Sequence, residues 1–256
     1  MASSGLIESM RYLAIGFKLV RTRGLRRFVW MPLLVNLLVF GGLGWWIYSA
    51  ASSWLDAFTL FDRFSDFWII QLLETLLRWL FGLVLFLVLG FVFTLLANLI
   101  GAPFNGLLAE RVEAHLTGNT APAAPPVMMM IKSLPRLMGS ELGKLVYMVI
   151  FLVPLLLLQL IPIVNLVAPV LLFMFGAWMF ALEYLDYPMG NHGALFRDVR
   201  RAVRQKRKTA FGFGVIVALF SLVPILNLFI MPIAVAGATA LYVDHWPDSS
   251  LQPQSS

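Results

Sequence analysis

The sequence predicts an all-α integral membrane protein with two full transmembrane helices, two proline-broken helical hairpins and amphipathic interfacial helices. Of the 256 residues, 60% are hydrophobic and only 12% are charged, about half the charged fraction of an ordinary soluble domain. Four stretches contain no Asp, Glu, Lys or Arg: 28–55, 79–109, 145–182 and 209–243. Each exceeds the roughly 20 residues that a helix needs to cross the hydrocarbon core. The last two stretches also contain internal prolines, which break helices.

We expect one membrane domain over residues 1–256, in which these stretches alternate with polar segments. The polar segments are a basic amphipathic helix over 1–27, an outer interfacial segment over 56–78, a cytoplasmic segment over 110–144, a basic cytoplasmic segment over 183–208 and a polar tail over 244–256. The first segment lacks the uninterrupted apolar core and the cleavage site of a signal peptide. We therefore expect it to belong to the mature protein.

The first two apolar stretches, 28–55 and 79–109, are interpreted as single spans. Trp30, Trp45, Trp46 and Trp79 lie near their ends. Aromatic residues of this kind favour the interface between membrane and water.

The other two stretches are interpreted as hairpins because each is too long for one straight helix. A short repeat supports this: PIVNL at 162–166 matches PILNL at 224–228. We expect the chain to turn at these repeats, with Pro162, Asn165, Pro224 and Asn227 as the turn residues and the two asparagines capping helix ends. Arms of roughly 15 to 18 residues are short enough for the hairpins to penetrate only part of the bilayer.

The placement of basic residues supports this topology. Two spans followed by two hairpins put 17 of the 19 Lys and Arg residues on one side of the membrane, and only Arg63 and Arg78 on the other. Four single spans would leave the basic segment 183–208 outside. Since cytoplasmic segments are enriched in Lys and Arg, both termini are predicted to be cytoplasmic.

The segment just before the first span has the features of an oxyanion site. Gly24 can end the preceding helix, and a helix beginning near Leu25 would direct unpaired amide N–H groups and the positive end of its dipole outward. Arg26 and Arg27 follow directly, and guanidinium groups pair with tetrahedral oxyanions in bidentate fashion. Alternatively, these arginines are anchors that contact lipid phosphate.

A second polar group lies near the inner end of the second span. Gly101 and Pro103 are expected to bend or unwind the helix there, and Asn98 and Asn105 can then satisfy the backbone groups that are freed. If the helix continues, Glu110 and Glu113 share one face and Arg111 lies about 100° away. These residues are predicted to form either a gate on an anion path or a structural network of ion pairs. The predicted gate residues are Asn98, Asn105, Glu110, Arg111 and Glu113.

The sequence lacks the residues that several classes of chemistry require. The chain has no cysteine, which excludes disulfides and thiol catalysis. His115, His192 and His245 show no ligand spacing and are interpreted as interfacial residues, so no metal site is predicted. No P-loop, hydrolase or metalloprotease motif is present, and we expect neither a cofactor nor an enzyme. Beside hairpins, the basic run 197–208 is expected to meet anionic lipid and not nucleic acid.

Three segments of the sequence resemble the bacterial CysZ family of sulfate permeases. They are GLRR at 24–27 with PLL at 32–34, APFNGLLAERVE at 102–113, and EYLDYPM at 183–189. The resemblance implies a multi-pass protein of the bacterial inner membrane that imports sulfate for cysteine synthesis. It also implies two long spans plus partly penetrating hairpins, and a sulfate site at the Gly-Leu-Arg-Arg segment.

The resemblance further implies a homo-oligomer with protomers in opposed orientations, whereas the basic residues favour one orientation. Sulfite, selenate and thiosulfate are further candidate anions, and both a channel and an ion-coupled carrier remain open. The rival hypothesis is a non-transporting membrane scaffold or regulator that binds anionic lipid and a partner protein. The Gly-Leu-Arg-Arg geometry distinguishes the two, because a lipid anchor does not need it.

Overall fold

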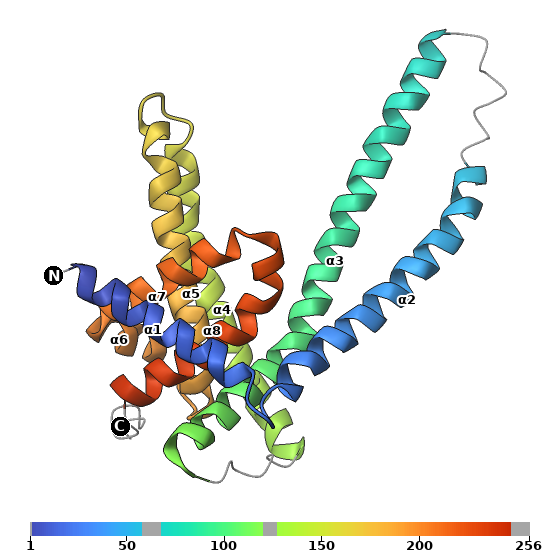
Figure 1. Ribbon diagram of the computed structural model, residues 1–256. Coiled ribbons are helices and arrows are strands. Elements are labelled where there is room, and N and C mark those ends of the chain that lie inside the picture. Colours follow the sequence, from blue (N-terminus) through green and yellow to red (C-terminus); the bar gives the residue numbers. More distant parts are fainter. Residues whose placement is uncertain (1, 58–67, 120–126, 247–256) are drawn as a thin grey trace. The chain divides into compact units, whose positions relative to one another are not determined.

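The computed structural model describes residues 2–57, 68–119 and 127–246, and these residues form helices and turns without a strand (Figure 1). The helices are α1 (Ala2–Val20), α2 (Arg27–Ala57), α3 (Trp68–Thr117), α4 (Val127–Leu158), the short 3-10 helix η2 (Val164–Leu166), α5 (Ala168–Asn191), α6 (Phe196–Gln205), α7 (Arg207–Ser221) and α8 (Pro224–His245). The prediction of an all-α membrane protein is confirmed. By length and composition, four described segments can cross a membrane: Arg27–Ile47, Gln71–Gly90, Gly139–Leu158 and Ala168–Asn191.

The chain divides into two compact units. One comprises Met1–Val29 and Asn105–Ser256, and the other comprises Trp30–Phe104. The second unit holds most of α2 and the first part of α3, and its described side chains are largely exposed. Inside it the rings of Phe40 and Phe93 lie 5.3 Å apart. Such an apolar exposed surface is typical of helices that face lipid.

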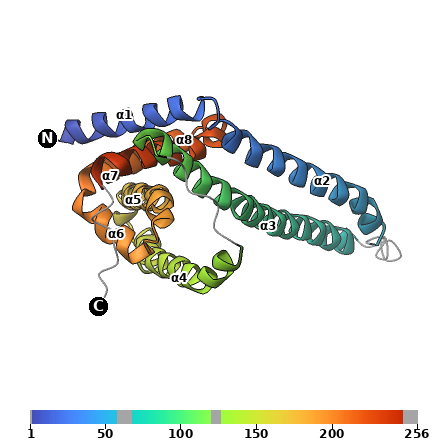
Figure 2. The same cartoon turned by 90° about the horizontal axis from the view of Figure 1, so that it is seen from below.

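In the first unit, helix α1 packs along α7 and α8 (Figure 2). The absence of a side chain at Gly16 permits this, because an added Cβ would lie 2.7 Å from the Gly237 amide nitrogen of α8. At the far end of the contact, the Tyr12 hydroxyl donates to the Asp244 carboxylate at 3.0 Å. Burial and this hydrogen bond raise the pKa of Tyr12. Helix α1 is therefore fixed on the protein, and so is the turn that follows it.

The first hairpin consists of α4 and α5, joined by a connection that contains Pro162 and Asn165. Its longer arm begins at Val127 and not near residue 145, since the helix also includes the amphipathic stretch before Lys144. Asn165 lies in η2, and the residues at the helix ends make no side-chain capping bond. The predicted capping role of Asn165 is therefore wrong.

The second hairpin consists of α7 and α8 and turns at Leu222 and Val223. The turn comes before the PILNL stretch at 224–228 and not within it, as had been expected. Pro224 takes the first position of α8, where a backbone N–H would have no partner inside the helix, so that proline is tolerated. Asn227 is consequently inside α8, and its side chain lies outside the described residues.

Helix α3 differs most from expectation. It starts at Trp68, so residues 68–78 of the predicted outer segment extend the span instead of forming a helix of their own; residues 58–67 lie outside the described part. It also continues through Gly101 and Pro103, so the predicted unwinding is not observed. One proline removes one backbone donor, which a helix with many other hydrogen bonds tolerates.

Candidate anion site

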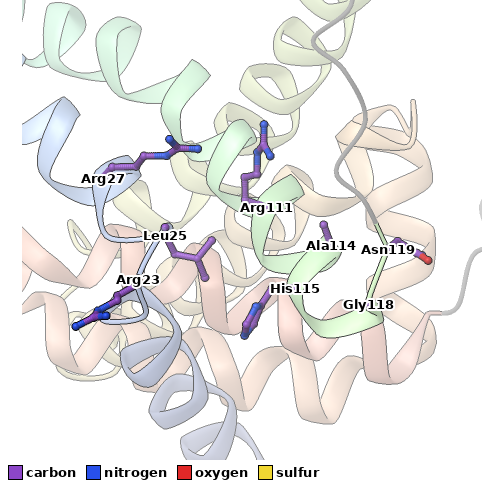
Figure 3. A pocket seen from close by; sticks show the side chains of 9 residues that line it. Arg23, Leu25, Arg27, Arg111, Ala114, His115, Gly118 and Asn119 are labelled. Atoms are coloured by element: carbon purple, nitrogen blue, oxygen red, sulfur yellow. The ribbon is translucent and has the colours of Figure 1, made fainter.

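A pocket of about 430 Å³ lies in the first unit between the turn after α1 and the last turns of α3. Arg23, Gly24, Leu25 and Arg27 line it on one side, and the α3 end lines the other (Figure 3). The lining residues from the α3 end are Arg111, Ala114, His115, Gly118 and Asn119. The pocket therefore joins two segments that are far apart in the sequence.

The turn between α1 and α2 is built by local hydrogen bonds. The amide N–H groups of Leu25 and Arg26 both donate to the Thr22 carbonyl at 3.3 Å, and Gly24 adopts φ 97°. A left-handed backbone of this kind favours glycine, but Gly24 does not end the preceding helix as predicted, because α1 already ends at Val20. Helix α2 starts at Arg27, two residues later than expected, because Leu25 and Arg26 belong to the turn.

The predicted backbone donors are therefore only partly available. The Leu25 amide is used within the turn. In contrast, the amides of Gly24 and Arg27 donate no hydrogen bond within the described part of the chain. Arg27 is the first residue of α2, where amide groups lack partners inside the helix.

The pocket is strongly cationic. Arg23, Arg27 and Arg111 line it together with His115, and none of its nine described lining residues is acidic. Figure 3 shows the Arg27 side chain extending toward Arg111 across the pocket. The Arg27 guanidinium also lies 4.9 Å from the ring centre of Phe28, which restricts its position. Arg27 and Arg111 thus offer guanidinium donors to one space, whereas the Arg23 guanidinium points away from them in this view.

Arg26, which the sequence placed in the anion site, is exposed and does not belong to the pocket lining. Arg111, which the sequence placed in a gate, lies in the pocket instead. The structure thus brings Arg27 and Arg111 together from two separately predicted groups. The roles of all these residues remain predictions.

Polar contacts with the end of α5 hold the α3 end in place. The Asn105 side chain donates to the Tyr187 hydroxyl at 3.3 Å, and the Asn191 side chain donates to the Gly106 carbonyl at 2.9 Å. Two turns further along α3, His192 contacts the Glu113 carboxylate at 2.8 Å. These contacts use one face of α3, so that Arg111 and His115, spaced by four residues, share the face toward the pocket.

The other predicted gate residues lie elsewhere. Asn105 is buried and Glu113 is engaged by His192, while Glu110 is half-buried. The Asn98 side chain lies outside the described residues. The structure therefore does not bring the four predicted gate residues with described side chains into one cluster.

Sequence reasoning missed two members of the pocket, Arg23 and His115. His115 was interpreted as an interfacial residue, yet it lines the pocket, whereas His192 and His245 contact Glu113 and Glu8. The spacing of four residues between Arg111 and His115 was a usable signal. Its meaning depends on which face of α3 meets the turn, and this is a tertiary property.

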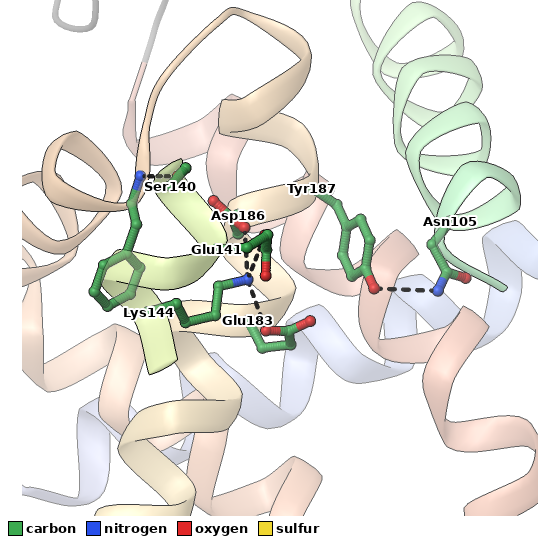
Figure 4. A network of polar contacts seen from close by, with 8 residues as sticks. Asn105, Ser140, Glu141, Lys144, Glu183, Asp186 and Tyr187 are labelled. Carbon is green, nitrogen blue, oxygen red and sulfur yellow. Dashed lines mark hydrogen bonds and ion pairs between the residues drawn. The ribbon is translucent and has the colours of Figure 1, made fainter. Parts of the chain in front are cut away.

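A second polar cluster links α4 to α5. The Lys144 ammonium group lies 2.9 Å from the Asp186 carboxylate, 3.0 Å from Glu183 and 3.2 Å from Glu141 (Figure 4). Lys144 stands just before the charge-free stretch, and its α5 partners stand just after it. The cluster therefore ties together the bases of both arms of the first hairpin.

The family model described as EI24, sulfate transporter CysZ/etoposide-induced protein 2.4, matches residues 12–232 of the chain. The matched range covers most of the chain and includes every residue that lines the pocket.

Proposed function

Since the chain belongs to the EI24 family of sulfate transporter CysZ and etoposide-induced protein 2.4, we propose that it is a permease for sulfate. In this proposal it carries sulfate across the bacterial inner membrane into the cytoplasm, for use in cysteine synthesis. It acts as a multi-pass homo-oligomer, without a cofactor or a covalent step.

The single observation that carries the proposal is the cationic pocket. Arg23, Arg27 and Arg111 line it, and His115 adds a fourth nitrogen-bearing side chain. A doubly charged tetrahedral anion can pair with more than one guanidinium at once, and each such charge-assisted hydrogen bond is stronger than a neutral one. The positive end of the α2 dipole adds to this attraction, because α2 begins at Arg27.

The donor chemistry favours sulfate over phosphate. Arginine side chains only donate hydrogen bonds. Sulfate at neutral pH only accepts them, whereas phosphate also carries hydroxyl donors that an arginine cannot satisfy. Selenate and thiosulfate share the acceptor pattern and the charge, and so does the unprotonated form of sulfite. The pocket is therefore proposed to admit these anions as well.

Passage through the membrane would begin at this pocket. In the proposed sequence, Arg26 and Arg27 attract the anion at the surface, and Arg111 completes its binding in the pocket. Asn98, Asn105, Glu110 and Glu113 are proposed to act beyond it, on the path through the bundle. The contact between Glu113 and His192 would then set the position of Arg111 indirectly.

Uptake of radiolabelled sulfate into liposomes that hold the purified protein tests the proposal. We expect the native protein to exceed empty liposomes and the double variant Arg27→Gln/Arg111→Gln to lose most of this uptake. A charge-assisted hydrogen bond contributes about 1.5–3 kcal/mol. Losing one therefore corresponds to roughly a 10- to 100-fold weaker affinity for sulfate.

The control is the double variant Arg11→Gln/Lys18→Gln, which removes the same charge from exposed positions on α1. It is expected to transport like the native protein. Equal losses in both double variants would mean that only net charge matters, and the pocket would lose its assigned role. If the folded native protein does not exceed empty liposomes, the non-transporting scaffold becomes the better account.

A further inference from the structure

The exposed surface of α6 and the start of α7 carries a dense group of cations. We define the basic ridge as the six exposed residues Arg197, Arg201, Arg204, Lys206, Arg207 and Lys208. We propose that the basic ridge binds the phosphate headgroups of anionic phospholipids. This inference does not depend on sulfate transport.

Helix α6 has two opposite faces. Phe196, Val199 and Val203 are buried on one of them. Arg197, Arg201 and Arg204 lie within about 60° of one another on the other face, given 100° per residue. The buried face is already occupied by the protein, so α6 cannot insert it into a membrane. Any partner must therefore be bound through the charges.

The protein holds α6 firmly in this orientation. The Phe196 amide donates to the Ser140 hydroxyl of α4 at 2.7 Å, and the Trp246 indole donates to the Ala202 carbonyl at 3.2 Å. Nearby, the Arg200 guanidinium packs 5.2 Å from the ring centre of Tyr147. The basic ridge is thus pre-organised, which reduces the entropy lost when it binds.

The charges of the basic ridge are not neutralised within the described part of the protein. No described carboxylate lies within ion-pair distance of its six cations. The only acidic residue of α6, Asp198, accepts the amide of Leu195 at 3.1 Å and caps the helix instead. A concentration of unpaired cations of this kind attracts phosphate, and guanidinium groups bind it in bidentate fashion.

The basic ridge lies at the start of α7, and this position identifies the lipid headgroup as its partner. From Arg207, α7 runs for 15 residues, about 22 Å, to a tip where Leu219, Leu222 and Val223 are exposed. An exposed apolar tip belongs in hydrocarbon. The opposite end then lies near the headgroup layer.

Helix α1 supports this placement independently. An added Cβ on its Gly5 would contact the Lys208 carbonyl at 3.7 Å, so α1 lies beside the basic ridge. Its outer face exposes Ile7, Met10 and Phe17 together with basic residues. This mixture is typical of a helix that lies in the membrane interface.

Thermal unfolding in a neutral detergent tests the proposal, with added phosphatidylglycerol compared with the same amount of phosphatidylcholine. We expect phosphatidylglycerol to raise the unfolding temperature more, and high salt to reduce this difference. The double variant Arg201→Gln/Arg204→Gln should bind phosphatidylglycerol about five-fold more weakly for each charge removed. Its unfolding temperature in phosphatidylcholine should match that of the native protein.

The comparison variant is again Arg11→Gln/Lys18→Gln, whose charges face the interface outside the basic ridge and are more widely spaced on α1, so that each contributes less than a charge of the ridge. It should keep most of the phosphatidylglycerol effect. Equal losses in the two double variants, or equal effects of the two lipids on the native protein, would overturn the proposal. A larger stabilisation by an RNA or DNA oligonucleotide than by phosphatidylglycerol would identify a nucleic-acid surface instead.

Discussion

At the scale of single residues, Gly24 has the clearest conformational requirement. Its φ of 97° lies in the left-handed region, and no atom lies within 4 Å of the position that a Cβ would take. A side chain at this position would therefore meet no steric clash, but the left-handed backbone conformation would be strained for any residue with a Cβ. Because Arg23 and Arg27 flank Gly24, the turn conformation determines where two pocket cations point.

We predict that Gly24→Ala weakens sulfate binding and lowers stability. The strained backbone costs about 1–2 kcal/mol, which corresponds to an unfolding temperature lower by roughly 2–8 °C for a protein of this size. Calorimetric titration with sulfate and thermal unfolding measure the two effects. The control is Gly176→Ala in α5, which also has no neighbour within 4 Å but a helical backbone, and which should not lower stability. Unchanged sulfate affinity in Gly24→Ala would contradict the role of the turn.

The residues of the pocket could be predicted only where the signal is local. Gly24, Arg27 and the break between two helices follow from a short sequence with known conformational preferences. Arg111 and His115 could not be assigned to the same pocket, because the sequence does not state which turn of α3 lies beside Gly24. Arg26 shows the opposite error: it lies in the turn before α2, and adjacency to Arg27 does not give both side chains the same direction.

At the scale of helices, the cluster around Lys144 determines how α4 pairs with α5. The side chain of Lys144 is 12% exposed, and those of Asp186 and Glu183 are 20% and 42% exposed. Removing the ammonium group would leave partly buried carboxylates beside one another. The cluster therefore contributes mainly by preventing an unpaired charge.

We predict that Lys144→Met destabilises the protein by about 2–3 kcal/mol, below the full cost of breaking a buried pair because Glu183 is partly hydrated. Glu141→Gln should change stability by less than about 0.5 kcal/mol, since exposed pairs contribute little and Glu141 is 62% exposed. Denaturation in detergent measures both. Adding Asp186→Asn to Lys144→Met should recover part of the loss. Equal effects of Lys144→Met and Glu141→Gln would show that the cluster is not needed for pairing.

Helices could be predicted from charge-free stretches and prolines, but their ends could not. The repeats at 162–166 and 224–228 predicted two hairpins, and α4–α5 and α7–α8 are hairpins. Their turns differ, because Pro162 lies inside a connection whereas Pro224 starts a helix. The extent of α3 was underestimated for a related reason: Glu74 and Arg78 ended the charge-free stretch, but charged residues do not end a helix.

At the scale of the whole molecule, composition predicted the class of protein and could not predict the polar clusters. The low charged fraction and the absence of cysteine are properties of the chain as a whole. In contrast, the anion pocket and the Lys144 cluster each join residues from distant helices. The sequence places Lys144 just before the charge-free stretch 145–182 and Glu183 and Asp186 just after it, and only the pairing of α4 with α5 brings them together.

The charges and the tips of the hairpins predict that they penetrate only part of the bilayer. From Lys144 to the end of α4 is about 14 residues, or about 21 Å, less than the roughly 30 Å of a hydrocarbon core. We predict that Ile163→Cys and Leu222→Cys, at tips that are 82% and 70% exposed, resist a membrane-impermeant maleimide from both sides of sealed vesicles and react after detergent is added. Arg204→Cys should react from the cytoplasmic side alone. The chain has no cysteine of its own, so the background is zero. Labelling of Ile163→Cys from the outer side would mean that α4 and α5 cross completely, because length alone permits either depth.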